Sequence, residues 1–504
     1  MVPAAQFTST KRQNAPFWLL ILALMLMLGM LAASIRPAAA ATPVNSLDYT
    51  ALDTYITAQM KKHGLKGIAL AVTEGDEILY LKGYGTAGQN RPMTAQTPMY
   101  IGSHSKSITG LAIAQLVDQG KIALNAPVQK YIPWFRVADP DASQKITISH
   151  LLHHTSGLSE SGYTNRTPDD ASLAEGVRAL STARLTAPVG MQFQYFNLNF
   201  SVLALVIETV TGQSYADYVQ QHIFTPLQMT HTYTDPATAR ANGLSQGYSR
   251  FLGFTVPWPQ HHPTYELANG FLISSAEDLA HYAIALNNQG VYQGASVLPP
   301  EKLKLLFAPI QGYGMGWFVE PGHYHHGGAN ETFKTFVDLY PERGLGVILL
   351  INQGYMIDHY ISAEQISRGV QAIVLGTPPP PVSEGWSVRT INQGVLVLVL
   401  ALSIFHTRNL FRLRTWAERM HGKTALRRAV DIALSFLIPL VILGIVFWQV
   451  KNFLSYRFNF TDQIDLMFRV LPDIGLVLLL TLIPDFIQGF YKLYAELSSK
   501  TRPH

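Results

Sequence analysis

A serine and a lysine three residues apart, Ser103 and Lys106, are the first residues in this sequence whose types and spacing could do chemistry. Residues at positions i and i+3 share one face of a helix, so the amine can lie within hydrogen-bond distance of the hydroxyl. A serine hydroxyl is a weak nucleophile until a base takes its proton, and a lysine in a partly desolvated pocket can be that base. The pair predicts nucleophilic catalysis, although the spacing alone also fits a helix N-cap followed by a solvated lysine.

The residues around this pair predict the start of a helix. Gly102 comes directly before the serine and permits a tight turn there. Apolar residues with mainly helical spacing follow, and Gly120 supplies a C-terminal stop. Ser103 is therefore expected at a helix N-terminus, where unpaired N–H groups and the macrodipole favour developing negative charge.

Two more motifs follow along the chain. A Tyr-x-Asn sequence runs from Tyr195 to Asn197, and His326-Gly327-Gly328 precedes a strand-like stretch. In this order the three motifs resemble those of the serine β-lactamase and penicillin-binding-protein superfamily, in particular the branch of class C β-lactamases, D,D-peptidases and related esterases. The resemblance covers Leu47 to Ile373 and does not extend to the C-terminal part.

The resemblance implies a role for each matching residue. Ser103 would be the acylated nucleophile, and Lys106 and Tyr195 would share the role of base. Asn197 would orient the lysine or the substrate amide. The backbone N–H groups of Ser103 and Ala329 would form the oxyanion hole.

The third motif departs from the pattern of the family. His326 stands where the family has the lysine of a Lys-Thr-Gly motif, so the site lacks a permanent cation for the carboxylate of β-lactams and D-Ala-D-Ala peptides. Gly327 and Gly328 would let a substrate backbone lie directly against this strand. Acyl transfer on an ester or peptide is expected more than efficient β-lactam hydrolysis.

Other histidines are interpreted as structural. His150, His153 and His154 have helical spacing, but the chain has no Cys, and no His-Glu-x-x-His motif accompanies them. The adjacent pairs His261-His262 and His325-His326 are interpreted as loop and cleft residues. The sequence therefore predicts no metal and no cofactor.

The composition excludes several functions. Apolar residues make up 48% and charged residues only 14% of the 504 residues, so a globule that is soluble throughout is not expected. The net charge of +4 does not indicate nucleic-acid binding, because the basic residues cluster beside apolar segments. Zero Cys excludes disulfides, thiol catalysis and Fe–S chemistry.

Residues 1–41 have the pattern of a secretory signal peptide. Lys11 and Arg12 precede an apolar run, Phe17–Ala33, and a small-residue stretch, Ala38–Ala41. The apolar run is longer than most signal sequences have, so an uncleaved signal anchor is the alternative. Either segment would export the domain that follows.

The exported domain, residues 42–376, is predicted to be α+β, with an antiparallel sheet flanked by helices and a helical lobe, as the β-lactamase/D,D-peptidase-like resemblance also implies. Ile68–Val72 and Ile78–Lys82 predict one hairpin. The stretches 335–340 and 346–351 predict another. The helix of the reactive serine is expected beneath the sheet, and a mostly helical insertion is expected between Ile122 and Ser275.

A proline-rich linker at 377–389 ends this domain, and residues 390–504 form a predicted transmembrane region. Its apolar segments lie near 390–407, 430–450 and 470–490. The second and third are long enough to span ~30 Å of hydrocarbon, whereas the first could also be a buried core helix.

The sequence thus predicts an extracytoplasmic, membrane-tethered serine hydrolase that acts through an acyl-enzyme on a peptide, amide or ester, with peptidoglycan as one candidate substrate. The alternative is a non-catalytic penicillin-binding-type sensor or binding protein that signals through its membrane helices. The expected partners are a small-molecule or peptide substrate and the membrane, without nucleic acid. The oligomeric state is left open.

Charge predicts the topology of this multi-pass cell-membrane protein. Seven basic residues follow the first apolar segment and mark that stretch as cytoplasmic by the positive-inside rule: Arg408, Arg412, Arg414, Arg419, Lys423, Arg427 and Arg428. An exported catalytic domain then requires the first segment to cross the membrane. The C-terminus is also predicted inside.

Protease added to intact cells should therefore cleave a tag inserted at Pro378–Pro381 and spare tags near Thr415 and at His504, as followed by immunoblotting. Protection of the linker tag would place the catalytic domain in the cytoplasm. Cleavage at Thr415 would show that the first segment does not cross.

Overall fold

The computed structural model describes residues 47–163, 167–252, 254–354, 362–380, 388–453 and 472–500. The predicted signal segment at 1–41 lies outside these residues, as does part of the linker.

A seven-stranded antiparallel sheet is the centre of the domain that precedes the linker, with the strand order β10-β11-β12-β13-β1-β2-β3. Both predicted hairpins are confirmed, because β1 pairs with β2 and β12 pairs with β13. The middle strands β1 and β13 are almost wholly buried and apolar, as expected for strands covered on both faces. The strands are β1 (Gly67–Glu74), β2 (Glu77–Gly88), β3 (Arg91–Pro92), β10 (Phe318–Glu320), β11 (His323–Ala329), β12 (Lys334–Tyr340) and β13 (Leu345–Ile351).

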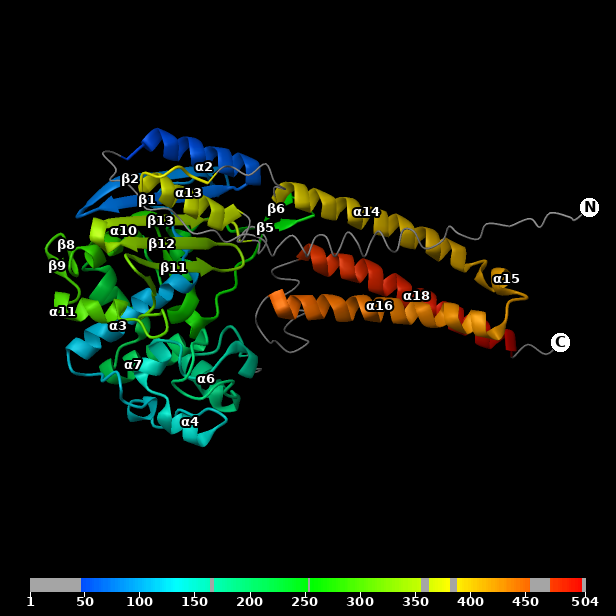
Figure 1. The fold of residues 1–504 in the computed structure, drawn as a ribbon, viewed down its shortest axis with the longest axis horizontal. Helices are drawn as coiled ribbons and strands as arrows, with labels where there is room; N and C mark the ends of the chain where they lie inside the picture. The colour runs from blue at the N-terminus through cyan, green and yellow to red at the C-terminus, as the bar shows by residue number, and fades with distance from the viewer. Residues whose placement is uncertain are drawn as a thin grey trace, which may run out of the picture. The chain divides into compact units, whose positions relative to one another are not determined.

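Helices cover the two faces of this sheet, as Figure 1 shows. On one face α2 (Tyr49–His63) packs with α13 (Glu364–Val374) over an apolar cluster from β1 and β13. On the other face α10 (Ala276–Asn287) contacts β1 and β13 directly. The helix α3 (Ser105–Asp118), expected beneath the sheet, instead packs mainly against η8 (Leu267–Phe271) and α7 (Leu198–Thr211). The serine helix is thus a buried element between sheet layer and helical lobe.

The insertion between Ile122 and Ser275 is helical in part, but most of its helices have only one or two turns. It also holds a hairpin, β5 to β6, that the sequence pattern did not predict. The remaining elements of the domain are β4 (Met99–Tyr100), η2 (Gly102–His104), η3 (Val128–Lys130), α4 (Pro140–Lys145), α5 (Ile148–Leu152), η4 (Glu160–Gly162), α6 (Leu173–Arg178), η5 (Ala179–Thr182), α8 (Tyr215–Val219), η6 (Gln220–Phe224), α9 (Pro236–Ala241), β5 (Tyr248–Phe251), β6 (Phe254–Pro257), η7 (Thr264–Glu266), η8 (Leu267–Phe271), β7 (Ile273–Ser274), β8 (Val291–Tyr292), β9 (Ala295–Ser296), α11 (Pro300–Leu303), η9 (Lys304–Phe307) and η10 (Pro341–Arg343).

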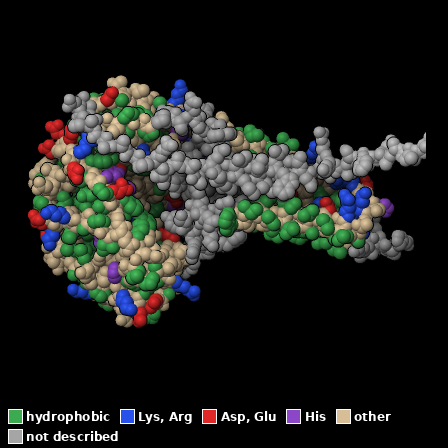
Figure 2. Space-filling model, in the orientation of Figure 1, with side chains coloured by type: hydrophobic (Ala, Val, Ile, Leu, Met, Phe, Trp, Pro, Cys, Tyr) green, Lys and Arg blue, Asp and Glu red, His purple; other side chains and the backbone are tan. Residues whose placement is uncertain are grey.

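In the described residues that follow, three apolar helices are long and apolar enough to cross a membrane. The first apolar segment belongs to a 26-residue helix whose apolar side chains at Val397 and Ile404 are mostly exposed, so it is not a core helix. Figure 2 shows hydrophobic side chains over the visible face of these helices. The helices are α14 (Val388–Leu413), α16 (Ala425–Phe453) and α18 (Pro472–Lys500), with the short α15 (Trp416–Met420) between the first two.

The basic stretch that was expected to be a loop is therefore largely helical. The apolar window of the first helix runs from Gln393 to Leu413, and that of the second begins at Ala425, so each differs from its predicted segment by several residues. Charges flanking an apolar segment can extend its helix, because long basic side chains reach polar surroundings from the helix ends.

Polar pairs join α18 to both other long helices. The ammonium of Lys492 lies 2.8 Å from Asp431 of α16, and Nδ1 of His406 on α14 lies 3.4 Å from Asp485. Ionisable groups inside an apolar helix bundle are costly unless they meet a partner. These contacts explain how Asp485, which the sequence places in an apolar segment, is accommodated.

Candidate active site

The candidate nucleophile Ser103 lies in a tight turn directly before α3. Gly102 has a φ of +54°, in the left-handed region that favours glycine, and η2 carries Ser103 into the helix. A Cβ atom at Gly102 would overlap the backbone nitrogen of Ala329, and one at Gly328 would overlap the carbonyl of Ile101. The serine turn and the end of β11 are therefore in backbone contact, which sets the N–H groups of Ser103 and Ala329 in adjacent segments.

This contact gives Gly328 a structural role in addition to the expected one. Its missing side chain accommodates the serine turn of the protein itself. Gly327 has more room, since a Cβ there would meet only the Thr335 carbonyl, at 3.5 Å. That a substrate backbone lies against both glycines stays a prediction.

Lys106 is fully buried one turn below the serine and connects three segments of the chain. Its Nζ lies 3.3 Å from Ser103 Oγ, and it donates hydrogen bonds to Asn197 Oδ1 at 2.8 Å and to the Asn269 carbonyl at 2.6 Å. Burial lowers the pKa of Lys106 to about 7, against the opposing effect of nearby carboxylates. A neutral amine is thus accessible near neutral pH.

The segment of Tyr195 reaches the same place from the helical lobe. The ring of Tyr195 lies 4.8 Å from Lys106 Nζ and packs at 4.3 Å on the buried ring of His154. Nδ1 of His154 accepts a hydrogen bond from the Phe196 N–H, and its carbonyl accepts one from the Gln194 N–H. His154 therefore holds the tyrosine segment in position. This is a structural role, as the sequence analysis expected for His154.

His326 lies on the face of β11 towards Tyr195, with the two rings 6.4 Å apart, as an uncharged residue. It is buried, its Nε2 lies 2.9 Å from the Tyr313 hydroxyl, and its Nδ1 lies 2.7 Å from the Gly327 carbonyl. Burial, with Lys106 nearby, holds the pKa of His326 well below its usual range. The position that carries a lysine in the family's motif is therefore neutral here.

Two carboxylates that no sequence motif indicated lie close enough to act on the lysine. Glu160 Oε1 accepts a hydrogen bond from the Asn197 N–H at 3.3 Å, and burial raises the pKa of Glu160 to about 7. Burial also raises the pKa of Glu266, which precedes the Asn269 carbonyl in the chain. Both lie in short helical turns within the insertion, and only the folded chain brings them to Lys106.

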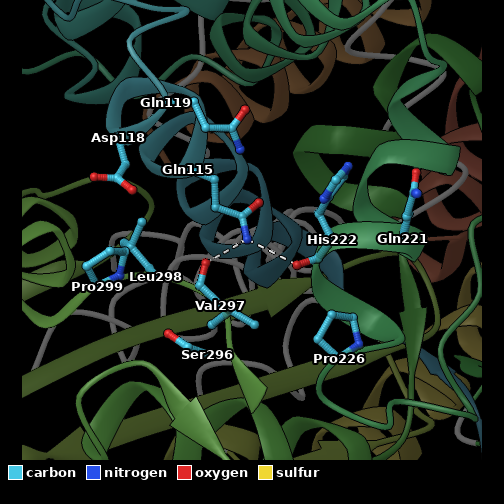
Figure 3. Close-up of a pocket in the computed structure, with 10 residues that line it drawn as sticks. All are labelled: Gln115, Asp118, Gln119, Gln221, His222, Pro226, Ser296, Val297, Leu298 and Pro299. Atoms are coloured by element: carbon cyan, nitrogen blue, oxygen red, sulfur yellow. Dashed lines mark hydrogen bonds between the residues drawn. The ribbon is translucent and has the colours of Figure 1, made fainter.

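A separate cavity of about 240 Å³ lies at the other end of α3. Figure 3 shows Gln115 at its wall, donating from Nε2 to the carbonyls of His222 and Val297. None of the residues that could carry acyl chemistry lines this cavity. The arrangement around Ser103, at the N-terminal end of α3, is therefore the candidate active site.

Known proteins are similar to this chain in sequence and in fold. A protein-family model described as Beta-lactamase matches residues 52–367. Protein flp of Staphylococcus aureus (strain MW2) is 27% identical over 402 residues, which cover 76% of this chain and 78% of flp. The putative penicillin-binding protein PbpX of Bacillus subtilis (strain 168) is 32% identical over 308 residues, which cover 59% of this chain and 73% of PbpX. The octameric penicillin-binding protein homologue of Pyrococcus abyssi superposes with a TM-score of 0.57 at 26% identity. The match covers 66% of this chain and 78% of the homologue.

The lowered pKa of Lys106, and the nearby carboxylates of Glu160 and Glu266 that oppose this shift, predict how the rate of Ser103 acylation depends on pH. Below its pKa the lysine is protonated and cannot accept the serine proton, so labelling of Ser103 by a fluorophosphonate should fall as pH decreases through about 7. Glu266→Gln removes a negative charge that favours the ammonium, so the pKa of Lys106 should fall and the acid limb should move to lower pH.

The matched control is Glu301→Gln, which alters an exposed carboxylate on α11 and should leave the profile in place. A limb that stays fixed or moves to higher pH in Glu266→Gln would contradict the assignment of the limb to Lys106.

Proposed function

The chain belongs to the Beta-lactamase family, and from this premise we propose that it is a membrane-tethered serine hydrolase whose catalytic domain acts outside the cytoplasm. It forms an acyl-enzyme on a peptide, amide or ester and then hydrolyses it. One observation carries the proposal: a lysine amine 3.3 Å from the Ser103 hydroxyl, buried so that the pKa of Lys106 is lowered to about 7. Perturbed pKa values of this kind cluster at catalytic sites.

The hydrogen bonds of Lys106 suit the neutral amine. A neutral amine has two N–H groups and one lone pair, and the two carbonyl oxygens of Asn197 and Asn269 accept the two N–H groups. The lone pair then faces the third partner, the Ser103 hydroxyl. Lys106 takes the serine proton as Oγ bonds to the substrate carbonyl carbon, and the carbonyl electrons move to its oxygen.

The resulting oxyanion is bound by the N–H groups of Ser103 and Ala329, whose segments are held together by the contact between Gly102 and Gly328. As the carbonyl re-forms, the leaving amine or alcohol takes the proton back from Lys106, with the Tyr195 hydroxyl as its partner in proton transfer. A water molecule then gives its proton to the same base and attacks the acyl ester. Cleavage of the ester releases the acid and regenerates Ser103.

The neutral state of His326 bears on the substrate class. A fixed cation at this position would bind a substrate carboxylate, whereas a neutral imidazole bonded to Tyr313 offers only hydrogen bonds. We therefore propose that the substrate is recognised mainly at its acyl group and side chains. Esters and uncharged amides fit this chemistry, and a cell-wall peptide is the candidate that an extracytoplasmic location would supply.

Covalent labelling tests the proposal. The full-length protein in detergent should react at one site with a fluorophosphonate or a fluorescent penicillin, and Ser103→Ala should abolish the label because only an activated serine is acylated. Folding should change little, since the Ser103 hydroxyl caps neither η2 nor α3 in the described structure. The measurement is in-gel fluorescence, with thermal unfolding followed by circular dichroism.

The matched control is Ser107→Ala, one turn further along α3, where the hydroxyl donates to the His104 carbonyl at 2.8 Å and lies 3.3 Å from His104 Nε2. This variant should keep the label. A wild-type protein that no acylating probe modifies would favour the non-catalytic binding protein, and a label retained in Ser103→Ala would place the nucleophile elsewhere.

Replacing His326 with lysine tests the substrate class. The added cation should raise the acylation rate by a carboxylate-bearing penicillin relative to a neutral ester by roughly tenfold, since hydrogen bonds to charged groups contribute about 1.5–3 kcal/mol. Comparing the ratio of the two rates removes any change in the reactivity of Ser103. His326→Gln, a neutral variant, should leave the ratio unchanged. An equal ratio in the lysine variant would show that His326 does not lie at the carboxylate position.

A further inference from the structure

The opposite face of the strand that carries His326 holds a second group of side chains, whose imidazole and carboxylate groups can bind metals. The strands β10 and β11 are joined by the tight turn Pro321-Gly322, and Glu320 pairs across the hairpin with His323. Side chains alternate along a strand, so His323 and His325 share one face while His326 lies on the other. The hairpin thus places two imidazoles and one carboxylate together, away from the serine.

The distances among these three side chains are close to those of a metal site. Oxygens of the Glu320 carboxylate lie 3.7 Å from Nδ1 of His323 and 3.7 Å from Nε2 of His325. The three donor atoms all lie within 4.8 Å of one another. Zinc bonds of about 2.0–2.2 Å in a tetrahedral site separate neighbouring donors by about 3.3–3.6 Å, so small side-chain rotations would complete the geometry.

A carboxylate behind the first imidazole fixes its orientation. Asp338 of β12 is buried, and its Oδ1 lies 2.9 Å from Nε2 of His323. Metal-binding histidines usually donate their other ring N–H to a carboxylate or carbonyl in this way, which fixes the tautomer. With Nε2 bonded to Asp338, the free Nδ1 of His323 faces Glu320 and is available to a metal ion.

Ring stacking holds both imidazoles in place. His325 stacks on Phe318 at 5.4 Å and on His323 at 4.8 Å, and His323 stacks in turn on Tyr340 at 4.7 Å. Because the rotamers are already ordered, little conformational entropy remains to be lost on binding.

From this arrangement we propose that Glu320, His323 and His325 bind a divalent transition-metal ion, with Asp338 as the residue that positions His323. Two imidazoles and a carboxylate suit Zn²⁺, and the exposure of Glu320 leaves the fourth position to water. The sequence pattern predicted no metal and interpreted His325 as a loop or cleft residue, because the spacing His-x-His is informative only when a strand places Glu320 opposite.

A second cluster in the described part of the chain contains potential metal-binding atoms that are already engaged in hydrogen bonds. His231, Glu277 and Asp278 also lie together, but this cluster contains one histidine. Asp278 Oδ2 already accepts hydrogen bonds from the His231 N–H and the Thr232 hydroxyl, at 2.7 and 2.6 Å. These bonds join α10 to the preceding loop, so this cluster serves as the natural control.

Metal binding at the hairpin would stabilise the edge of the sheet that lines the cleft. β10 has only three residues and is the terminal strand, and β11 carries His326 and Gly328 towards the serine turn. An ion bound to Glu320 on β10 and to two histidines on β11 ties these strands together outside their backbone hydrogen bonds. The ion takes no part in acyl transfer, because its ligands lie on the face away from His326.

The test uses the untagged full-length protein in detergent, stripped with EDTA and dialysed. Titration with Co²⁺ should give visible absorption typical of a four-coordinate ion, saturating at one equivalent, and Zn²⁺ should displace it. His323→Ala and His325→Ala should each abolish this signal, while Asp338→Asn should weaken binding by about 10–100-fold. His231→Ala should bind as the wild type does.

Folding of each variant is checked by circular dichroism, and Zn²⁺ should raise the melting temperature of the wild type but not of His325→Ala. The proposal is overturned if the wild type does not saturate at one equivalent, if His325→Ala retains the cobalt spectrum, or if His231→Ala removes it. These measurements need no hydrolytic activity, so they stand apart from the test of Ser103.

Discussion

The burial of a single amine is the constraint on which the candidate site depends. Lys106 lies where three segments meet: the first turn of α3, the residues that lead into α7, and the carbonyl at Asn269 in η8. A charge in such a place costs several kcal/mol unless it is paired or neutralised. The protein supplies oxygen acceptors rather than a contacting carboxylate, so the amine can lose its proton and still keep every N–H bonded. The same bonds hold the helical lobe against the serine helix. The packing of the lobe and the proposed reactivity of the serine therefore both depend on Lys106 Nζ.

The sequence was sufficient for the parts of this structure that local patterns determine. The two hairpins, the Tyr-x-Asn segment and the long apolar helices follow from alternation, spacing and length. The sequence was insufficient where the site depends on contacts between residues that are distant along the chain. The Asn269 carbonyl carries no side-chain signal, and Glu160 and Glu266 become relevant only because turns of the insertion fold over Lys106. The place of α3 also escaped prediction, because a helix that is buried all round does not reveal which layer it faces.

Strand β11 shows how one short element serves two surfaces. Its cleft side presents His326, and its end fits the serine turn so closely that Gly328 cannot carry a side chain. Its other side presents two stacked histidines that face Glu320. Because alternate residues point in opposite directions, the composition of each surface can vary without changing the other, while the position of the strand is common to both. This coupling makes the sheet edge a sensitive part of the domain.

The absence of a fixed cation in the cleft has a consequence for encounter kinetics. Charged clefts draw oppositely charged ligands from a distance and raise association rates, an effect that decreases with ionic strength. With His326 neutral and the pKa of Lys106 lowered to about 7, neither group is a permanent cation at neutral pH. For the proposed hydrolase we therefore expect ligands to gain little long-range attraction from these two groups, and their arrival rates to depend little on salt. Selection among them falls to the time each remains bound, which is set by shape and hydrogen bonding at close range.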